Sequence, residues 1–186
     1  VKMVPMQLCT LTWTPVLDSP DLVAPRVRDA IVAWATQIPS IADEILVAAI
    51  DPQFADTQAM TDEYQIPLEL SANCVLVAGR RGGEEKLAAA VVRATGRADV
   101  NNVIRRHLDV RKASFLPTDR AVEDSQMAYG GITPIGLPDH VRLLIDEQVR
   151  DGGLASIGSG IRESKLVLPG ERLAELPGAE VLILAL

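Results

Sequence analysis

Histidine and cysteine are scarce in this chain, and their scarcity excludes several kinds of site. The two histidines, His107 and His140, are too few for a multi-histidine metal site, and neither lies near a cysteine in sequence. Cys9 and Cys74 are far apart and form no paired motif, which argues against a disulfide framework and favours reduced thiols. We therefore expect no metal and no cofactor, with His107 in a structural role and His140 at the surface.

Long apolar runs and common catalytic motifs are also missing. No run approaches the roughly 20 apolar residues needed to cross a bilayer, and residues 1–6 lack the features of a secretory signal. The chain has neither the Gly-x-Ser-x-Gly elbow of serine hydrolases nor a phosphate loop ending in Gly-Lys-Ser/Thr. These absences predict a cytoplasmic protein without a membrane partner.

Negative charge prevails over the whole chain, but one window is basic. The formal net charge of −7 argues against a broadly basic nucleic-acid binder. Residues 80–112 nevertheless hold nine basic and four acidic side chains, a local charge of +5. Phosphate contacts need only such a local patch, so an RNA partner is compatible with the sequence. The alternative is an ordinary solvated surface.

Two glycine-rich segments stand out among the residues that are present. Residues 129–138 include three glycines and two prolines, which suits neither a helix nor a strand interior. Gly130 and Gly131 would leave main-chain N–H groups open to a ligand, while Pro134 holds the loop rigid. Residues 158–160, Gly-Ser-Gly, offer the same chemistry. Two such loops facing one cleft would hold a carbonyl or carboxylate oxygen; the alternative is two tight turns between strands.

Residues 1–39 are expected to form an N-terminal helical extension. Ser19 is a candidate N-cap, with Pro20 at the first helical position. The apolar face of this helix would consist of Val27, Ile31, Trp34 and Ala35. One hypothesis is that this face docks on another protein.

Residues 40–186 are expected to form one domain in which strands and helices are mixed irregularly. Strands are predicted at about 45–50, 74–78, 86–95, 142–145, 154–157, 165–168 and 181–184. Helices are predicted to begin near Asp56, Asp99 and Pro117, with a further helical turn at 173–176. The absence of a regular βαβ alternation predicts an α/β (mixed α+β) fold with a bent mixed sheet or partial barrel flanked by helices.

From about Leu46 onward the chain resembles the YbaK/ProX family of aminoacyl-tRNA deacylases, which are tRNA editing domains. The resemblance is carried by residues 130–136 (Gly-Gly-Ile-Thr-Pro-Ile-Gly), 144–146 (Leu-Ile-Asp), 158–162 (Gly-Ser-Gly-Ile-Arg), 166–169 (Leu-Val-Leu-Pro) and 178–181 (Gly-Ala-Glu-Val). It implies the mixed, bent-sheet fold. It also implies hydrolysis of the ester that joins a mischarged amino acid to tRNA.

One residue departs from the family pattern. Members of the family usually carry a lysine just before the first long strand, where this chain has Asn73. Asparagine donates a hydrogen bond but carries no charge, a loss that would cost on the order of a few kcal/mol of transition-state stabilisation. Lys165, beyond the second glycine loop, either supplies a charge from the other side or faces solvent.

The resemblance and the two loops together assign the candidate site. Asn73 would orient the substrate and Thr133 would help to hold the attacking water. The candidate substrate-binding residues are Thr57, Met60, Gly130, Gly131, Ile132, Pro134, Gly136, Asp146, Gly158, Ser159, Gly160 and Arg162. For Asp146, a role as general base competes with a turn or a salt bridge.

The expected partner is the 3′ end of an aminoacyl-tRNA, with an aminoacyl-tRNA synthetase as a further candidate. The main rival hypothesis is a catalytically weakened binding module for tRNA ends or a synthetase, because Asn73 replaces the family lysine. The sequence indicates neither the edited amino acid nor the oligomeric state.

Overall fold

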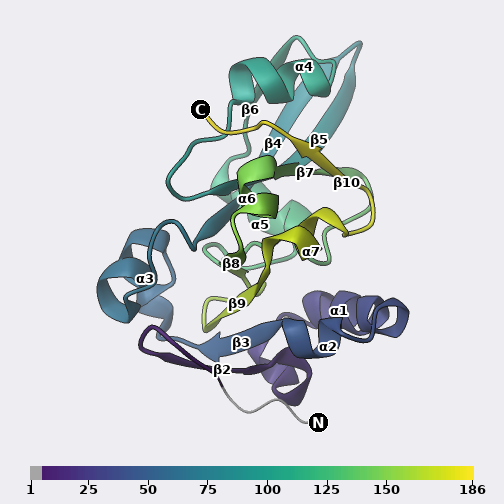
Figure 1. Ribbon diagram of the computed structural model, residues 1–186. Helices are drawn as coiled ribbons and strands as arrows, with labels where there is room; N and C mark the ends of the chain where they lie inside the picture. The colour runs from purple at the N-terminus through teal and green to yellow at the C-terminus, as the bar shows by residue number, and fades with distance from the viewer. Residues whose placement is uncertain (1–5) are drawn as a thin grey trace.

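Residues 6–186 are described by a computed structural model (Figure 1); residues 1–5, which belong to the expected extension and to the segment tested for a secretory signal, lie outside the described residues. The strands are β1 (Met6–Leu8), β2 (Leu11–Pro15), β3 (Leu46–Ala49), β4 (Ala72–Arg81), β5 (Glu84–Arg93), β6 (Lys112–Phe115), β7 (Val141–Asp146), β8 (Leu154–Gly158), β9 (Ser164–Pro169) and β10 (Ala179–Leu182). The helices are α1 (Pro25–Gln37), α2 (Ile41–Glu44), α3 (Thr57–Tyr64), α4 (Arg105–His107), α5 (Thr118–Ser125), α6 (Glu147–Asp151) and α7 (Gly170–Ala174), with single turns η1 (Val16–Asp18), η2 (Pro20–Leu22), η3 (Pro52–Phe54) and η4 (Val100–Ile104).

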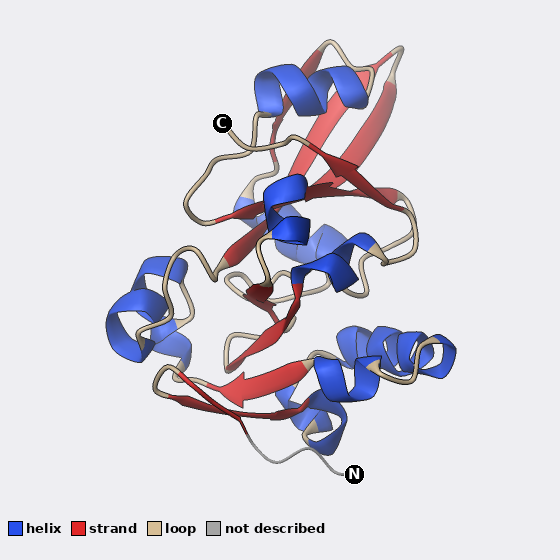
Figure 2. Ribbon diagram, in the orientation of Figure 1, coloured by secondary structure: helices blue, strands red, loops and turns tan. Residues whose placement is uncertain are grey.

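The strands form two five-stranded sheets. The first sheet has the order β1-β2-β3-β9-β8 and is antiparallel throughout. The second has the order β10-β7-β5-β4-β6, with parallel pairs at β10–β7 and β5–β7. A bridge between Ser71 and Ser156 joins them, and the helices lie around the strands (Figure 2). The structure thus confirms the mixed α/β class with a bent sheet flanked by helices.

The longest pairing is the hairpin of β4 and β5, ten residues each. Gly82 and Gly83 form its turn with φ angles of +59° and +85°, a conformation that glycine adopts without steric cost. β4 carries Asn73 at its beginning and Arg81 at its end, so the two residues lie at opposite ends of the sheet.

The N-terminal segment departs from the sequence-based expectation. It contains β1 and β2 as well as helix, and α1 begins at Pro25 instead of Pro20. Ser19 makes no capping bond; its hydroxyl lies 3.3 Å from the hydroxyl of Thr14, and Val23 is extended, which separates η2 from α1. Pro25 at the first helical position follows the usual preference, since its missing N–H has no helical partner there.

The apolar face of α1 packs into the main core of the chain. Val27, Ile31 and Trp34 are buried, as predicted, and join one apolar cluster with residues of β4, β5, β7, β8 and β9. The hypothesis that this face docks on another protein therefore loses its basis, because the chain itself covers it. The predicted domain boundary lies between residues 39 and 40, and β2, which precedes it, pairs with β3, which follows it. The boundary therefore stays a prediction.

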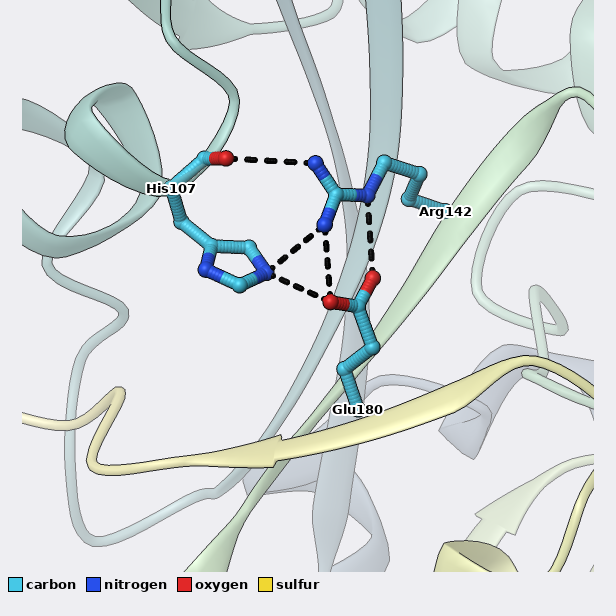
Figure 3. A network of polar contacts seen from close by, with 3 residues as sticks. All are labelled: His107, Arg142 and Glu180. Carbon is cyan, nitrogen blue, oxygen red and sulfur yellow. Dashed lines mark hydrogen bonds and ion pairs between the residues drawn. The ribbon is translucent and has the colours of Figure 1, made fainter.

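A polar network ties α4 to the second sheet (Figure 3). His107 Nε2 lies 2.8 Å from a carboxylate oxygen of Glu180, and Arg142 donates to both oxygens of that carboxylate at 2.9 and 2.7 Å. Arg142 also donates to the carbonyl oxygen of His107 at 3.1 Å. His107 therefore has the structural role that the sequence suggested.

Replacing Glu180 with glutamine is expected to lower the free energy of unfolding by about 0.5 kcal/mol at pH 7, because the pair is partly exposed and screened. The hydrogen bond from Arg142 lowers the pKa of Glu180. Its stabilisation is therefore present above its ordinary pKa of 4.5 and lost as the pH falls through the lowered value. Urea unfolding at pH 7 and in acid should show that the free energies of unfolding of the wild type and Glu180→Gln become equal in acid. The exposed Glu163→Gln is the control, and an equal deficit at both pH values would contradict the assignment.

Candidate functional site

A cavity of about 250 Å³ lies where the two sheets meet. Its lining comes from the start of α3, the start of β4, the first glycine loop (residues 129–138), the end of β8 and the start of β9. Lys165 is the one cation and Asp56 the one carboxylate among the described residues that line it. The cavity therefore combines segments from the whole length of the domain.

The two glycine loops contact each other directly beside this cavity. The N–H of Gly160 donates to the carbonyl oxygen of Gly131 at 2.7 Å, and the N–H of Ala128 donates to that of Gly160 at 2.9 Å. A Cβ atom on Gly158 would lie 2.6 Å from the carbonyl oxygen of Ile132, closer than atoms can pack. The glycines at 131 and 158 thus permit close approach of two backbones.

A hydrogen bond next to the first glycine loop corrects the expectation that the N–H of Gly131 is open to a ligand. The N–H of Gly131 is bonded to the carbonyl oxygen of Ala128 at 2.9 Å, so it is not open to a ligand. Gly130 and Ile132 do line the cavity, and their N–H groups have no partner among the described residues. The backbone donors available at the cavity are therefore those on either side of Gly131.

Asn73 lies at the start of β4 and lines the cavity together with Thr57 and Met60. Its Oδ1 accepts a hydrogen bond of 2.8 Å from the hydroxyl of Thr57, the first residue of α3. Since Thr57 satisfies the amide oxygen, the amide NH₂ of Asn73 keeps its two donors for a ligand. Met60 is buried and gives this side of the cavity an apolar wall.

Lys165 lies in β9, paired with Gly158 of β8 on one side and Ala48 of β3 on the other. Its Nζ donates to the carbonyl oxygen of Gly130 at 2.9 Å and lines the cavity, which settles the choice between a cavity-facing and a solvent-facing side chain. Burial lowers the pKa of Lys165 to about 8; Asp56 opposes this shift and Arg162 adds to it. The signal in the sequence was a single lysine next to the apolar run 166–168.

Cys74 also lines the cavity, but it cannot act as a nucleophile at neutral pH. Burial raises the pKa of its thiol to about 12, so the thiolate is essentially absent. No histidine lines the cavity in the described chain, and so the usual thiol–imidazole or hydroxyl–imidazole pair is missing.

Arg162 holds the first glycine loop in place from outside the cavity lining. Its guanidinium donates to the carbonyl oxygen of Tyr129 at 2.9 Å and, through Nε and Nη2, to that of Pro52 at 3.2 and 2.9 Å. It also lies 3.6 Å from Asp56. Because its three hydrogen bonds reach two main-chain oxygens in separate segments, Arg162 connects the loop to the turn before α3.

Several residues assigned to the site from the sequence lie elsewhere. Thr133 is fully buried outside the cavity lining, and its hydroxyl has no partner among the described residues. Ser159 is buried; its hydroxyl donates to the carbonyl oxygen of Ile161 and accepts from the hydroxyl of Ser164. Asp146 accepts a bond of 3.1 Å from the N–H of Leu184 within the protein interior. None of these three side chains lines the cavity, and Ser159 and Asp146 bond to neighbouring groups of the chain, so the geometry gives them no contact with a substrate there.

Pro134 and Gly136 line a different hollow, of about 590 Å³, next to α1. Gly136 has a φ of +80° and approaches the main chain of Arg26 and Val27. This part of the glycine loop therefore packs on α1 instead of facing the cavity.

The basic window divides between the interior and the far end of the second sheet. Arg93 is buried and donates to the carbonyl oxygens of Leu70, Gln148, Val149 and Leu154. This arginine is therefore unavailable for phosphate contacts. Arg80, Arg111 and Lys112 are exposed at the opposite end of β4 from the cavity.

No helix within residues 6–186 is both long and apolar enough to span a membrane. In the same part of the chain, no three side chains of histidine, cysteine, aspartate or glutamate come together as a metal site.

Comparison with known proteins identifies the family. Residues 51–176 match the aminoacyl-tRNA editing domain. A solved structure described as a "putative trans-editing enzyme for prolyl tRNA synthetase" superposes with a TM-score of 0.69 at 16% identity, covering 88% of this chain and 99% of its own. Hypothetical protein APE2540 gives a TM-score of 0.72 at 15% identity, covering 84% and 99%.

A scaffold protein used for epitope grafting gives a TM-score of 0.67 at 16% identity, covering 88% of this chain and 99% of its own. No curated protein sequence matches. At such identities the structural likeness shows the fold alone, whereas the family match extends over more than half of the sequence. This chain belongs to the aminoacyl-tRNA editing domain family.

Proposed function

We propose that this protein hydrolyses the ester bond of mischarged aminoacyl-tRNA, acting in trans on the 3′ end. The observation that carries the proposal is the cavity beside the two contacting glycine loops, in which Asn73 and Thr57 form a hydrogen-bonded pair. The cavity holds donors of the kind that a carbonyl oxygen requires, within an editing-domain fold.

Water is the proposed nucleophile, since no histidine lines the cavity and Cys74 is a neutral thiol. The amide of Asn73 would orient the aminoacyl ester, with the N–H groups of Gly130 and Ile132 directed to its carbonyl oxygen. Thr133, proposed from the sequence to hold the water, lies outside the cavity lining. The hydroxyl of the terminal ribose would position the water instead.

The acceptor stem of the tRNA would extend from the cavity along β4 toward its far end. Arg80 follows Asn73 by seven residues, or roughly 23 Å of extended strand. Arg111 and Lys112 lie beside Arg80 and make no ion pair within the described chain. These three cations are the proposed contacts for acceptor-stem phosphates, in place of Arg93, which is buried.

The test is the release of amino acid from a panel of mischarged tRNAs. We expect hydrolysis above the buffer rate for at least one mischarged tRNA. Asn73→Ala should lower kcat/KM about tenfold, because one hydrogen bond from the amide to the aminoacyl ester is lost. The exposed Asn101→Ala is the matched control. Rates equal to buffer across the whole panel would remove the enzymatic claim.

The rival is a binding module that has kept the fold and lost catalysis, which the replacement of the family lysine by Asn73 favours. Asn73→Lys separates the two hypotheses. An inactive scaffold would gain hydrolysis from the new charge, whereas an adapted enzyme would lose activity or change its preferred substrate.

A further inference from the structure

Lys165 is the cavity residue for which the fold itself offers the least explanation. Its ammonium group has three donors, and the structure gives it one partner, the carbonyl oxygen of Gly130 at 2.9 Å. No carboxylate of the described chain lies within ion-pair distance of it. Two donors of a largely buried cation are therefore free toward the cavity that it lines.

A cation in this position opposes folding. Removing an ammonium group from water is costly unless it is paired, and the side chain of Lys165 is only partly exposed. The pairing of β9 with β3 and β8 is made by main-chain groups that any residue supplies. Retaining a charge at a cost in stability is a common feature of functional sites.

We propose that Lys165 provides the positive charge that stabilises the carbonyl oxygen of the aminoacyl ester as water attacks it. The inference rests on the proposed function and names the side chain that stabilises the negative charge developing on the carbonyl oxygen. Lys165 is the one cation lining the cavity among the described residues, and Asn73, which shares that cavity, is uncharged.

The step balances without any further reactant. The oxygen of water bonds to the ester carbon, and the carbonyl π electrons move to the carbonyl oxygen, which accepts hydrogen bonds from Lys165. The tetrahedral intermediate then re-forms the carbonyl and expels the ribose oxygen, which gains the proton that the water loses. Lys165 keeps its proton throughout, so the products are a free amino acid and a tRNA with a free terminal hydroxyl.

The geometry also gives the reaction a dependence on pH. The charged and titratable groups near Lys165 are Asp56 before α3, Arg162 before β9, Tyr129 in the glycine loop and Cys74 in β4. Burial lowers the pKa of Lys165 to about 8. Because the protonated amine is the active form, enzymatic hydrolysis should be full below that value and fall as the pH rises through it, after subtraction of the spontaneous rate.

The decisive experiment compares Lys165→Gln, Lys165→Arg and Lys165→Met with the wild type on the most reactive mischarged tRNA. We expect kcat to fall about 100-fold in Lys165→Gln, with KM changed less than about threefold, since the charge acts in the transition state. Lys165→Arg should keep part of the activity and lose the alkaline decline, because arginine stays protonated. Lys86→Gln, in β5, is the control.

Two further measurements separate function from structure. Lys165→Met should melt at the same or a higher temperature than the wild type, because a buried charge is removed. Lys165→Gln combined with Asn73→Lys should recover about tenfold of the lost kcat by restoring one charge to the cavity. A lower melting temperature for Lys165→Met, an unchanged kcat, or a loss confined to KM would overturn the assignment of Lys165 while wild-type activity upholds the deacylase. An inactive wild type would overturn the deacylase itself.

Discussion

Replacing Gly158 with alanine is expected to lower deacylation by more than 100-fold and the free energy of unfolding by about 2–3 kcal/mol. The added Cβ would lie 2.6 Å from both the carbonyl carbon of Gly131 and the carbonyl oxygen of Ile132. Both neighbours are main-chain atoms, so the two loops would have to move apart. Displacement of catalytic donors by about 1 Å can cost 100-fold in rate.

Urea unfolding and hydrolysis assays on the same preparation would measure both effects. Gly83→Ala is the control, because Gly83 has a positive φ of +85°, unlike Gly158, but no atom within 4 Å of a new Cβ. It should cost about 1 kcal/mol through backbone strain and leave activity intact. If Gly158→Ala is as stable and active as the wild type, the two loops are not in the contact described.

Replacing Arg93 with methionine is expected to lower the free energy of unfolding by about 3–5 kcal/mol. Arg93 is 4% exposed and binds four carbonyl oxygens that come from the turn before β4, from β8 and from α6. Burial lowers the pKa of its guanidinium, and the nearby charge of Asp146 opposes that shift. Methionine fills similar volume but leaves those oxygens and Asp146 without a cation.

Denaturant unfolding of Arg93→Met would be compared with that of the exposed Arg111→Met, which should change stability by less than about 0.5 kcal/mol. The double variant Arg93→Met with Asp146→Asn should recover part of the loss, because the unpaired carboxylate is then neutral. Equal stability of the Arg93 and Arg111 variants would show that the carbonyl contacts contribute nothing.

Structure that depends on neighbouring residues was predicted well. The helix after Asp56, the strand before Asp51 and the β4–β5 hairpin appear close to their expected bounds. Each has a local signal: an apolar face at helical spacing, a continuous apolar run, or a pair of glycines between two strands. The two glycine loops were likewise visible as motifs.

Short strands that pair with distant segments were missed. β2 pairs with β3 and β6 pairs with β4, in both cases with about 30 residues or more between the partners. Their composition does not distinguish them from loops, since the partner supplies much of the stabilisation. At Ser19 a plausible helix start was present but unused, because the chain there forms a single turn before α1.

Identity of the family, the mixed fold class and most longer elements were determined by the sequence alone, because they depend on motifs and on residues close together in the chain. Only the tertiary structure decided that Asn73, Thr57 and Lys165 share a cavity, while Thr133 and Asp146 lie outside its lining. For the strand residues Asn73, Lys165 and Asp146, the physical reason is that successive residues of a strand point to opposite faces. Which face of β9 meets the cavity was decided by its register with β3 and β8.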